Sequence, residues 1–386
     1  MPKQRLRLSQ QDDWTGKMAM NANKVENNVQ LALDLFGLDP LVDRDFTHTL
    51  SLYDVVGKYI YDRRSKILTG VTSAADAKFH RKIIHGNSEI TATITAANIE
   101  RTGKNGEKES VFAFPGTREQ AIEDVLRKLA TERRAETYET QLPNKKKKFH
   151  LIGLQFSLYE IHQELERQGK GYNYVEIREG LEILSKAGLN FVSEDGSTLA
   201  NANFFPVLFF ADAPKKGDAQ AFICFHPLVT DLITNTKYRR SKYSKLFEFQ
   251  SQRARLFYDR LCCSWIQAGP GRPYNILLTT LIAAWKDPAN RLAKDKEIIV
   301  EALNELVERD IIEKYEAEPK KNKGKIYDWL FTLHASNSFA KQQAAAQKVF
   351  NQITAKAEGR ALMSEEGQSQ DNEHDNSDGK SSQIPF

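Results

Sequence analysis

Positively charged side chains gather in one segment of the chain, 237–260, where they could neutralise a polyanion. The segment holds eight lysines and arginines against two acidic residues, a net charge of +6 in 24 residues. Tyr238, Ser241 and Tyr243 lie among them and offer hydroxyl groups to phosphate oxygens. Because lysine and arginine bind phosphates and release their counterions, the segment predicts a phosphate-binding surface; the alternative is a solvated helix face. The candidate binding residues here are Arg239, Arg240, Lys242, Lys245, Arg253 and Arg255.

A second group of cations opens a predicted helix over 291–309. Arg291, Lys294 and Lys296 occupy its first two turns. The N-terminal turns of the second helix of a helix-turn-helix reach base edges, where arginine or lysine can read guanine. The same helix carries four glutamates that would repel phosphate, so we expect only its first two turns to approach DNA.

The sequence lacks the short motifs of common catalytic and metal sites. It contains no G-x-x-x-x-G-K-[ST] phosphate loop, no His-x-His pair, no His-Glu-x-x-His and no Cys-x-x-Cys. No nucleophile stands out as the centre of a hydrolase triad. We therefore predict a binding protein that is not an enzyme and has no metal or cofactor.

Two similar runs of elements would position these cations, each with a helix, a turn, a second helix and a two-stranded hairpin. This is the order of a winged helix-turn-helix. The first run has helices that begin at Ser157, with a capping box to Glu160, and at Asn173, then strands 189–192 and 204–210. The second has helices 279–285 and 291–309, then strands 311–315 and 326–333. At a constant shift of 122 residues, apolar positions coincide, which indicates an internal duplication: Ile177, Leu181, Leu184 and Leu189 fall on Ile299, Leu303, Leu306 and Ile311.

The loops of the two predicted hairpins differ in charge. The second contains Lys320, Lys321, Lys323 and Lys325, and the first contains Glu194 and Asp195. We therefore expect the second run to contact DNA and the first to serve association, although exposed turns are often lysine-rich without a partner. Elsewhere we expect a hairpin of strands 88–100 and 110–114, and helices over 117–140, 226–235 and 244–266.

Length and composition place the chain among intracellular globular proteins. Its 386 residues suggest two or three domains. The net charge of +4 is uneven, because residues 357–386 carry −5 and the rest of the chain +9. Three cysteines exclude a disulfide framework and favour a reducing compartment. No apolar run is long enough to span a membrane, so we predict a soluble cytoplasmic protein.

A short apolar stretch lies in the otherwise polar N-terminal region. Its residues are Gln30, Leu31, Leu33, Leu35 and Phe36. Such a stretch, led by glutamine, suits docking in a preformed groove of a partner protein. The alternative is the start of an element that packs on the body of the protein.

Taken together, these residues resemble the iteron-binding plasmid replication initiators, which are built from two winged helices. The resemblance rests on the duplicated run, on the basic segment 238–245, and on Ser251-x-x-Ala254-Arg255 followed by Tyr258-Asp259. Residues 30–35 match the QLxLxL form of the motif that binds the bacterial sliding clamp. The resemblance covers about residues 30–335.

The resemblance implies a function in DNA replication. Such a protein binds direct repeats of duplex origin DNA as a monomer, helps to open the duplex, and recruits the sliding clamp, the replicative helicase and the host initiator. Dimers of the family associate through the N-terminal winged helix and often act as repressors. The C-terminal winged helix reads the repeat, which carries over here to Arg291, Lys294, Lys296 and the loop lysines.

We therefore expect an α+β protein with two tandem winged helix-turn-helix domains. The expected divisions are a flexible arm 1–49, an association domain 50–212, a DNA-binding domain 213–335, and a segment 336–386 with a helix and a disordered acidic tail. A winged-helix transcriptional regulator remains the alternative, which does not explain the clamp-like stretch or the duplication. A nuclease-type initiator would need a metal site that the sequence does not show.

Overall fold

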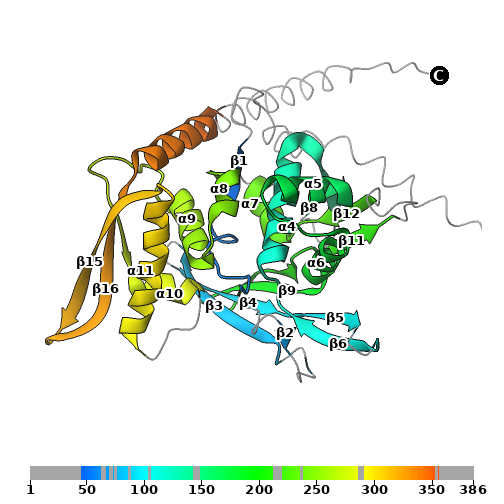
Figure 1. Ribbon diagram of the computed structural model, residues 1–386, viewed down its shortest axis with the longest axis horizontal. Coiled ribbons are helices and arrows are strands. Elements are labelled where there is room, and N and C mark those ends of the chain that lie inside the picture. Colours follow the sequence, from blue (N-terminus) through cyan, green and yellow to red (C-terminus); the bar gives the residue numbers. More distant parts are fainter. Residues whose placement is uncertain are drawn as a thin grey trace, which may run out of the picture.

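Two hydrophobic cores organise the described part of the computed structural model (Figure 1). One core takes its buried side chains from Leu50 to Tyr238 and the other from Tyr243 to Phe339, and we call these parts the first and second units. The architecture is mixed α/β, as the sequence predicts. The structure describes residues 45–352 except 62–66, 69–72, 74–75, 86–87, 103–105, 142–147, 212–219, 235–237 and 286–290, and it also describes residue 355.

The first unit combines antiparallel sheets with packed helices. Its strands are β1 (Phe46–Leu50), β2 (Ile67–Leu68), β3 (Lys78–His85), β4 (Ser88–Thr95), β5 (Ala97–Thr102), β6 (Lys108–Ala113), β7 (Ala135–Gln141), β8 (Lys148–Ser157), β9 (Gly188–Ser193), β10 (Thr198–Asn203), β11 (Val207–Phe210) and β12 (Gln220–Cys224). Its helices are α4 (Thr117–Leu129), a π-helix Ala130–Arg134, α5 (Leu158–Arg167), α6 (Tyr174–Lys186) and α7 (Pro227–Thr234). The sheets have the strand orders β10-β9-β4-β3, β11-β12-β8-β7 and β2-β6-β5. In Figure 1 the helices lie above β3, β4 and β9, whose other face forms the lower edge of the molecule.

Helices α5 and α6 begin where their capping residues predict. The Ser157 hydroxyl accepts a hydrogen bond from the Glu160 amide (3.2 Å), and the Glu160 carboxylate accepts one from the Ser157 amide (2.8 Å). Asn173 and Glu176 form the same reciprocal arrangement at the start of α6. Because each pair satisfies amide groups that a helix start leaves free, the predicted helix, turn, helix order is confirmed in the first unit.

The second unit repeats this order in a longer form. Its elements are α8 (Tyr243–Glu248), α9 (Gln252–Ser264), β14 (Tyr274–Leu277), α10 (Leu278–Trp285), α11 (Leu292–Glu308), β15 (Ile312–Asn322), β16 (Lys325–Ala335) and a helix over 337–352. The strands form an antiparallel sheet of order β14-β16-β15. The hairpin of β15 and β16 extends away from the body beside α11 (Figure 1), and we call it the wing.

The tip of the wing is a two-residue turn. Asn322 pairs with Lys325, and the residues between them, Lys323 and Gly324, have φ angles of 48° and 80°. Two central residues with positive φ are typical of a type I′ turn, whose twist matches that of the two strands. The wing therefore stays paired up to a two-residue turn, with a register shift between Lys320 and Lys321, where the sequence suggested a loop.

The eight apolar positions that define the predicted duplication are all buried. None exceeds 1% exposure, and they are Ile177, Leu181, Leu184, Leu189, Ile299, Leu303, Leu306 and Ile311. In both units they lie on the second helix of the pair and at the start of the following strand region. The 122-residue shift therefore relates equivalent core positions.

Three expected elements differ from the structure in the first unit. The partner of β9 in the hairpin is β10, because the apolar run 204–210 instead buries Phe204 and Phe205 and then forms β11 in another sheet. The expected helix 117–140 gives way to β7 after residue 134, where seven residues pair with β8. The expected strand 88–100 is divided into β4 and β5, which belong to different sheets.

The expected helix 244–266 is interrupted at residues 249–251. The Glu305 carboxylate of α11 accepts hydrogen bonds from the amides of Gln250 (2.6 Å) and Ser251 (3.0 Å). The Ser251 hydroxyl then accepts from the Arg253 and Ala254 amides and caps α9. This side-chain contact from a distant helix was not visible in the local pattern.

The two units meet along a polar and backbone contact zone. Strand β1 pairs with β13 (Tyr238–Lys242), which leads into the second unit. The Gly57 amide donates to the Ala284 carbonyl at the end of α10 (2.9 Å). Strand β12 and helix α7, which lie after the expected domain boundary at 212, pack with the first core. Among the described residues, no helix is long and apolar enough to cross a membrane.

Candidate nucleic-acid interface

The start of α11 presents two exposed cations to solvent. Asp295, Ile299 and Leu303 are buried on the inner face of the helix, which rotates Arg291 and Lys294 outward. Neither Arg291 nor Lys294 forms an ion pair with another described residue within 4.0 Å. Both charges are therefore available to an anionic partner.

The wing carries the second set of exposed cations. Lys321, Lys323 and Lys325 surround its tip and are exposed, whereas Lys320 is half-buried and lies 4.0 Å from the Glu318 carboxylate. In Figure 1 the tip of the wing and the start of α11 lie toward the same lower edge of the molecule. The structure thus brings together two of the three cationic groups that the sequence singled out.

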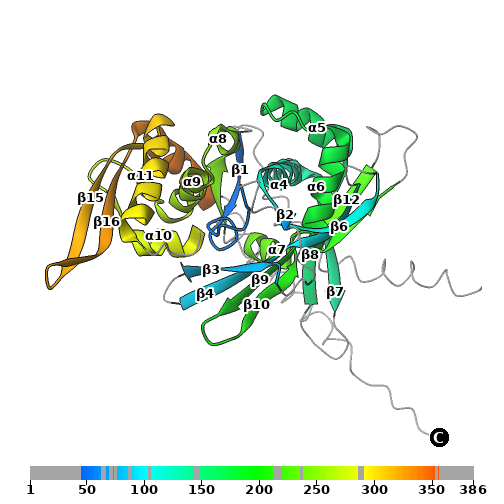
Figure 2. The same cartoon turned by 60° about the horizontal axis from the view of Figure 1, so that its bottom comes forward.

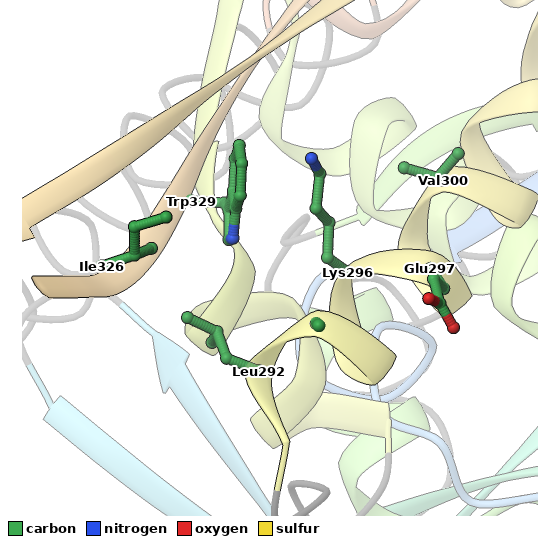
Figure 3. A pocket seen from close by; sticks show the side chains of 7 residues that line it. Leu292, Lys296, Glu297, Val300, Ile326 and Trp329 are labelled. Carbon is green, nitrogen blue, oxygen red and sulfur yellow. The ribbon is translucent and has the colours of Figure 1, made fainter.

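Lys296 occupies the space between these two groups. Its ammonium nitrogen lies 3.4 Å from the centre of the Trp329 ring on β16, a cation–π contact. Figure 3 shows both side chains rising from facing elements, with Leu292 below them and Ile326 to the left of Trp329. Lys296 therefore links α11 to the wing.

The four glutamates of α11 differ in how close they lie to Arg291 and Lys294 and in whether they are hydrogen-bonded. Glu305 is engaged with the start of α9, as described above. Glu301 and Glu308 are exposed on later turns, and Glu297 borders the space near Lys296. Arg291 and Lys294 thus lie on a first turn without an exposed carboxylate, whereas the exposed glutamates of the helix lie on its later turns.

The basic segment 238–245 lies elsewhere. The Lys245 ammonium pairs with Glu248 (2.8 Å) and donates to the Arg309 carbonyl at the C-terminal end of α11 (3.3 Å). Since α11 has 17 residues, Lys245 is about 25 Å from Arg291. Lys245 therefore lies at the opposite end of α11 from Arg291 and Lys294.

Strand β13 carries the rest of this segment. Arg239 stacks on Phe350 of the C-terminal helix, with 4.3 Å between the guanidinium carbon and the ring centre. Burial lowers the pKa of Arg239. Arg240 and Lys242 are half-buried on the same strand, paired with His48 and Phe46 of β1. Of these residues, Arg239 supports the packing of the C-terminal helix on the body.

The prediction that Arg255 binds phosphate is corrected by the structure, because the Arg255 side chain is buried. Its guanidinium makes two hydrogen bonds to Asp124 of α4, at 2.5 and 2.8 Å, and lies 3.7 Å from the Asp259 carboxylate. A guanidinium so placed joins the two units and cannot reach a phosphate. Arg253, two positions earlier, is half-buried at the start of α9.

A buried network of charges surrounds this junction. Arg127 makes two hydrogen bonds to Asp54 (2.7 and 2.9 Å), and Lys58 lies 3.3 Å from the same carboxylate. Although burial opposes ionisation, these two cations hold the pKa of Asp54 at about 2. Burial raises the pKa of Asp259 to about 7, against the opposing effect of Arg255. Of these buried ion pairs, that of Arg255 with Asp124 joins the two units, and those of Asp54 lie within the first unit.

Strand β3 adds cations that the sequence did not single out. Lys78, His80 and Lys82 alternate on its exposed face, while Ile83 is buried on the other. Lys82 pairs with Glu89 (2.7 Å), and the His80 ring shares a hydrogen bond with Thr93 (2.9 Å). Strand β3 packs beside α10, and Figure 2 shows this sheet face turned forward. In the sequence, the alternation of polar and other residues over 78–84 was the signal that could have predicted this exposed strand face.

Other predicted features fall outside this surface. The clamp-like stretch, with Gln30, Leu31, Leu33, Leu35 and Phe36, lies outside the described residues, as does the acidic stretch 357–386. Within the described residues, no group of three or more histidine, cysteine, aspartate or glutamate side chains is arranged to hold a metal ion.

Comparisons with known proteins give structural neighbours only. No protein-family model matches the chain, and no curated protein sequence matches it. Two solved structures of domains 2 and 3 of RctB are similar, both 8% identical, with TM-scores of 0.41 and 0.38; they cover 79% and 75% of this chain and 98% and 99% of their own. A structure of Pi initiator protein in complex with iteron DNA is 11% identical, with a TM-score of 0.38, and covers 57% of this chain and 91% of its own.

Proposed function

We propose that the chain is a DNA-replication initiator that binds duplex origin DNA through the start of α11 and the wing. The observation that carries this proposal is the exposed pair Arg291 and Lys294 beside a paired hairpin whose tip carries Lys321, Lys323 and Lys325. The helix start would enter the major groove, and the wing would contact the neighbouring backbone. In this assignment each unit contains one winged helix, built on α5, α6, β9 and β10 or on α10, α11, β15 and β16.

The duplication and the N-terminal stretch favour an initiator over a transcriptional regulator. Initiators of the resembling family use one winged helix to read a direct repeat and the other to associate. Among them, the sequence is similar to the broad-host-range plasmid initiator TrfA. We assign the acidic hairpin of the first unit to association with a second copy, and the clamp-like stretch to the bacterial sliding clamp. The replicative helicase and the host initiator are further proposed partners, in the bacterial cytoplasm.

The motif Ser251-x-x-Ala254-Arg255 with Tyr258-Asp259, which contributed to this resemblance, has a structural role. Ser251 caps α9, Ala254 and Tyr258 are fully buried, and Arg255 and Asp259 belong to the junction network. The residues Ser251 to Asp259 therefore hold the two units together. We assign the DNA contacts to other residues.

A replication assay tests the proposal. A DNA circle that carries the gene, its flanking DNA and no other origin is expected to persist in a host cell. Replacing both Arg291 and Lys294 by alanine should abolish persistence and origin binding in gel shifts, because both exposed charges of the helix start are removed. Lys242→Ala is the matched control, since this half-buried lysine lies on β13 and should change neither result.

The outcomes separate the candidate functions. Binding to flanking DNA without persistence of the circle would favour a transcriptional regulator, and magnesium-dependent strand cleavage would favour a nuclease-type initiator. Unchanged gel shifts for the double variant would show that the start of α11 is not the contact. Replacing Leu33 and Leu35 by alanine should weaken capture of the sliding clamp while DNA affinity stays the same.

A further inference from the structure

An apolar cavity opens between α11 and the wing, within the surface assigned to DNA. It has a volume of about 570 Å³. Leu292 and Val300 line it from the helix, and Ile326 and Trp329 line it from β16. Figure 3 shows that these side chains face one another across the opening, with Lys296 between them.

The surroundings of this cavity indicate the chemistry of its occupant. Ile326 is 43% exposed and the neighbouring Tyr327 is 60% exposed, so apolar groups are presented to solvent on the wing itself. Arg291, Lys294 and Lys325 lie beside them in the chain and are exposed. An occupant must therefore combine an apolar group with a strongly anionic frame, and this charge complementarity favours DNA over a neutral apolar peptide.

Only one of the four DNA bases presents an apolar group in the major groove. Thymine carries a 5-methyl group there, whereas the other base edges present hydrogen-bond donors and acceptors. Lys296 rises beside Trp329, with its ammonium over the ring (Figure 3). The cavity thus combines apolar walls with the ammonium of Lys296 and the carboxylate of Glu297, an arrangement that suits a methyl group next to polar base edges.

We infer that this cavity receives the 5-methyl groups of one or two thymines in the bound duplex, and that Leu292, Ile326 and Trp329 determine specificity for them. The inference rests on the proposed function, because it places α11 in the major groove. It adds a prediction about base composition, namely that the preferred site has thymine opposite the junction of α11 and the wing.

The test uses duplexes that the full-length chain itself selects from a random pool. Each thymine of the selected duplex is then replaced by deoxyuridine, which lacks only the methyl group. At one or two positions the Kd should rise roughly fourfold, the effect of losing one buried methyl contact. Because this arm uses the unaltered protein, it does not depend on whether a variant folds.

The protein arm assigns the effect to the cavity. The variant Leu292→Ala with Ile326→Ala should bind the thymine duplex roughly fourfold to tenfold more weakly and should no longer distinguish it from the deoxyuridine duplex. Val307→Ala is the matched control, because Val307 is an exposed apolar residue on the last turn of the same helix. It should keep the full sensitivity to deoxyuridine.

Each result has a defined meaning. Tight duplex binding without any effect of deoxyuridine would overturn this inference and leave the proposed function standing. Retained sensitivity in the double variant would overturn the assignment to the cavity. If that variant instead lost self-association while sensitivity to deoxyuridine was absent, the occupant would be a second copy of the chain. Failure to select any duplex would contradict the proposed function itself.

Discussion

Two arginines on the same helix, Arg253 and Arg255, show how differently identical side chains are used. Both lie in the first turn of α9, within the cation-rich segment 237–260, and both are candidate phosphate-binding residues in the sequence. Arg255 points into the junction and meets Asp124 of α4, 131 residues earlier in the chain, whereas Arg253 stays half-buried. Net charge along a segment could not distinguish them, because the deciding partner is remote in sequence.

Replacing Arg255 by alanine should lower the free energy of unfolding by about 3–5 kcal/mol, because it leaves the Asp124 and Asp259 carboxylates buried without their cation. Urea denaturation measures this change. Arg253→Ala on the same turn is the control and should change stability by less than about 0.5 kcal/mol. An Arg255→Ala protein of normal stability that had lost DNA affinity would contradict the junction role and restore the original expectation.

Asp259 should make stability depend on pH near neutrality. Burial raises its pKa to about 7, so the folded state holds a proton that the unfolded state releases above about pH 4. The folded protein therefore loses stability as pH rises from about 5 to 7, by at most about 1.4 kcal/mol per pH unit. Asp259→Asn should remove this dependence. Parallel pH profiles of unfolding for the two proteins would show that Asp259 does not titrate in this range.

At the scale of elements, the sequence was most informative where local signals dominate. Capping residues located α5 and α6, and the buried positions of α11 followed its apolar period. The division of 244–266 into α8 and α9 depends on Glu305, and the partner of β9 depends on which strand reaches its edge. These choices depend on contacts between distant segments, which one sequence does not display. The start of α11 and the wing could be predicted, and the cations of β3 were missed.

The wing lysines should contribute to affinity without sequence preference. Replacing Lys321, Lys323 and Lys325 by alanine should weaken binding to all duplexes alike, because such residues contact phosphates. The slope of log K against log salt should fall by roughly two to three, since each phosphate contact contributes about 0.9. Titrations at several salt concentrations measure this slope. Lys314, also exposed on β15 but near its start, gives the control variant Lys314→Ala.

At the scale of the whole molecule, the junction decides how the two units can act together. The sequence indicated two similar units, yet it could not show that α10 lies beside β3 or that charges are buried between the units. This placement puts β3 beside α10, which in turn contacts α11 (Figure 2). The basic segment 238–245 instead contacts the C-terminal helix and the end of α11.

Gly57 permits the close approach of the units. A Cβ atom at this position would lie 2.8 Å from the Trp285 carbonyl oxygen, which is backbone and cannot move aside easily. Gly57→Ala should therefore lower the free energy of unfolding by about 1–3 kcal/mol. Gly171→Ala is the matched control, because no atom lies within 4 Å of its added Cβ. Equal stability of both variants in urea would mean that the junction is looser than the structure shows.

The central claim is that duplex DNA covers the start of α11 and the wing. Lysine acetylation of the intact protein, followed site by site by mass spectrometry with and without a selected duplex, tests it most directly. We predict that DNA slows the modification of Lys294, Lys321, Lys323 and Lys325 several-fold and leaves Lys186 and Lys341 unchanged. Unaltered reactivity of the first four lysines, with protection on β13 instead, would contradict the account.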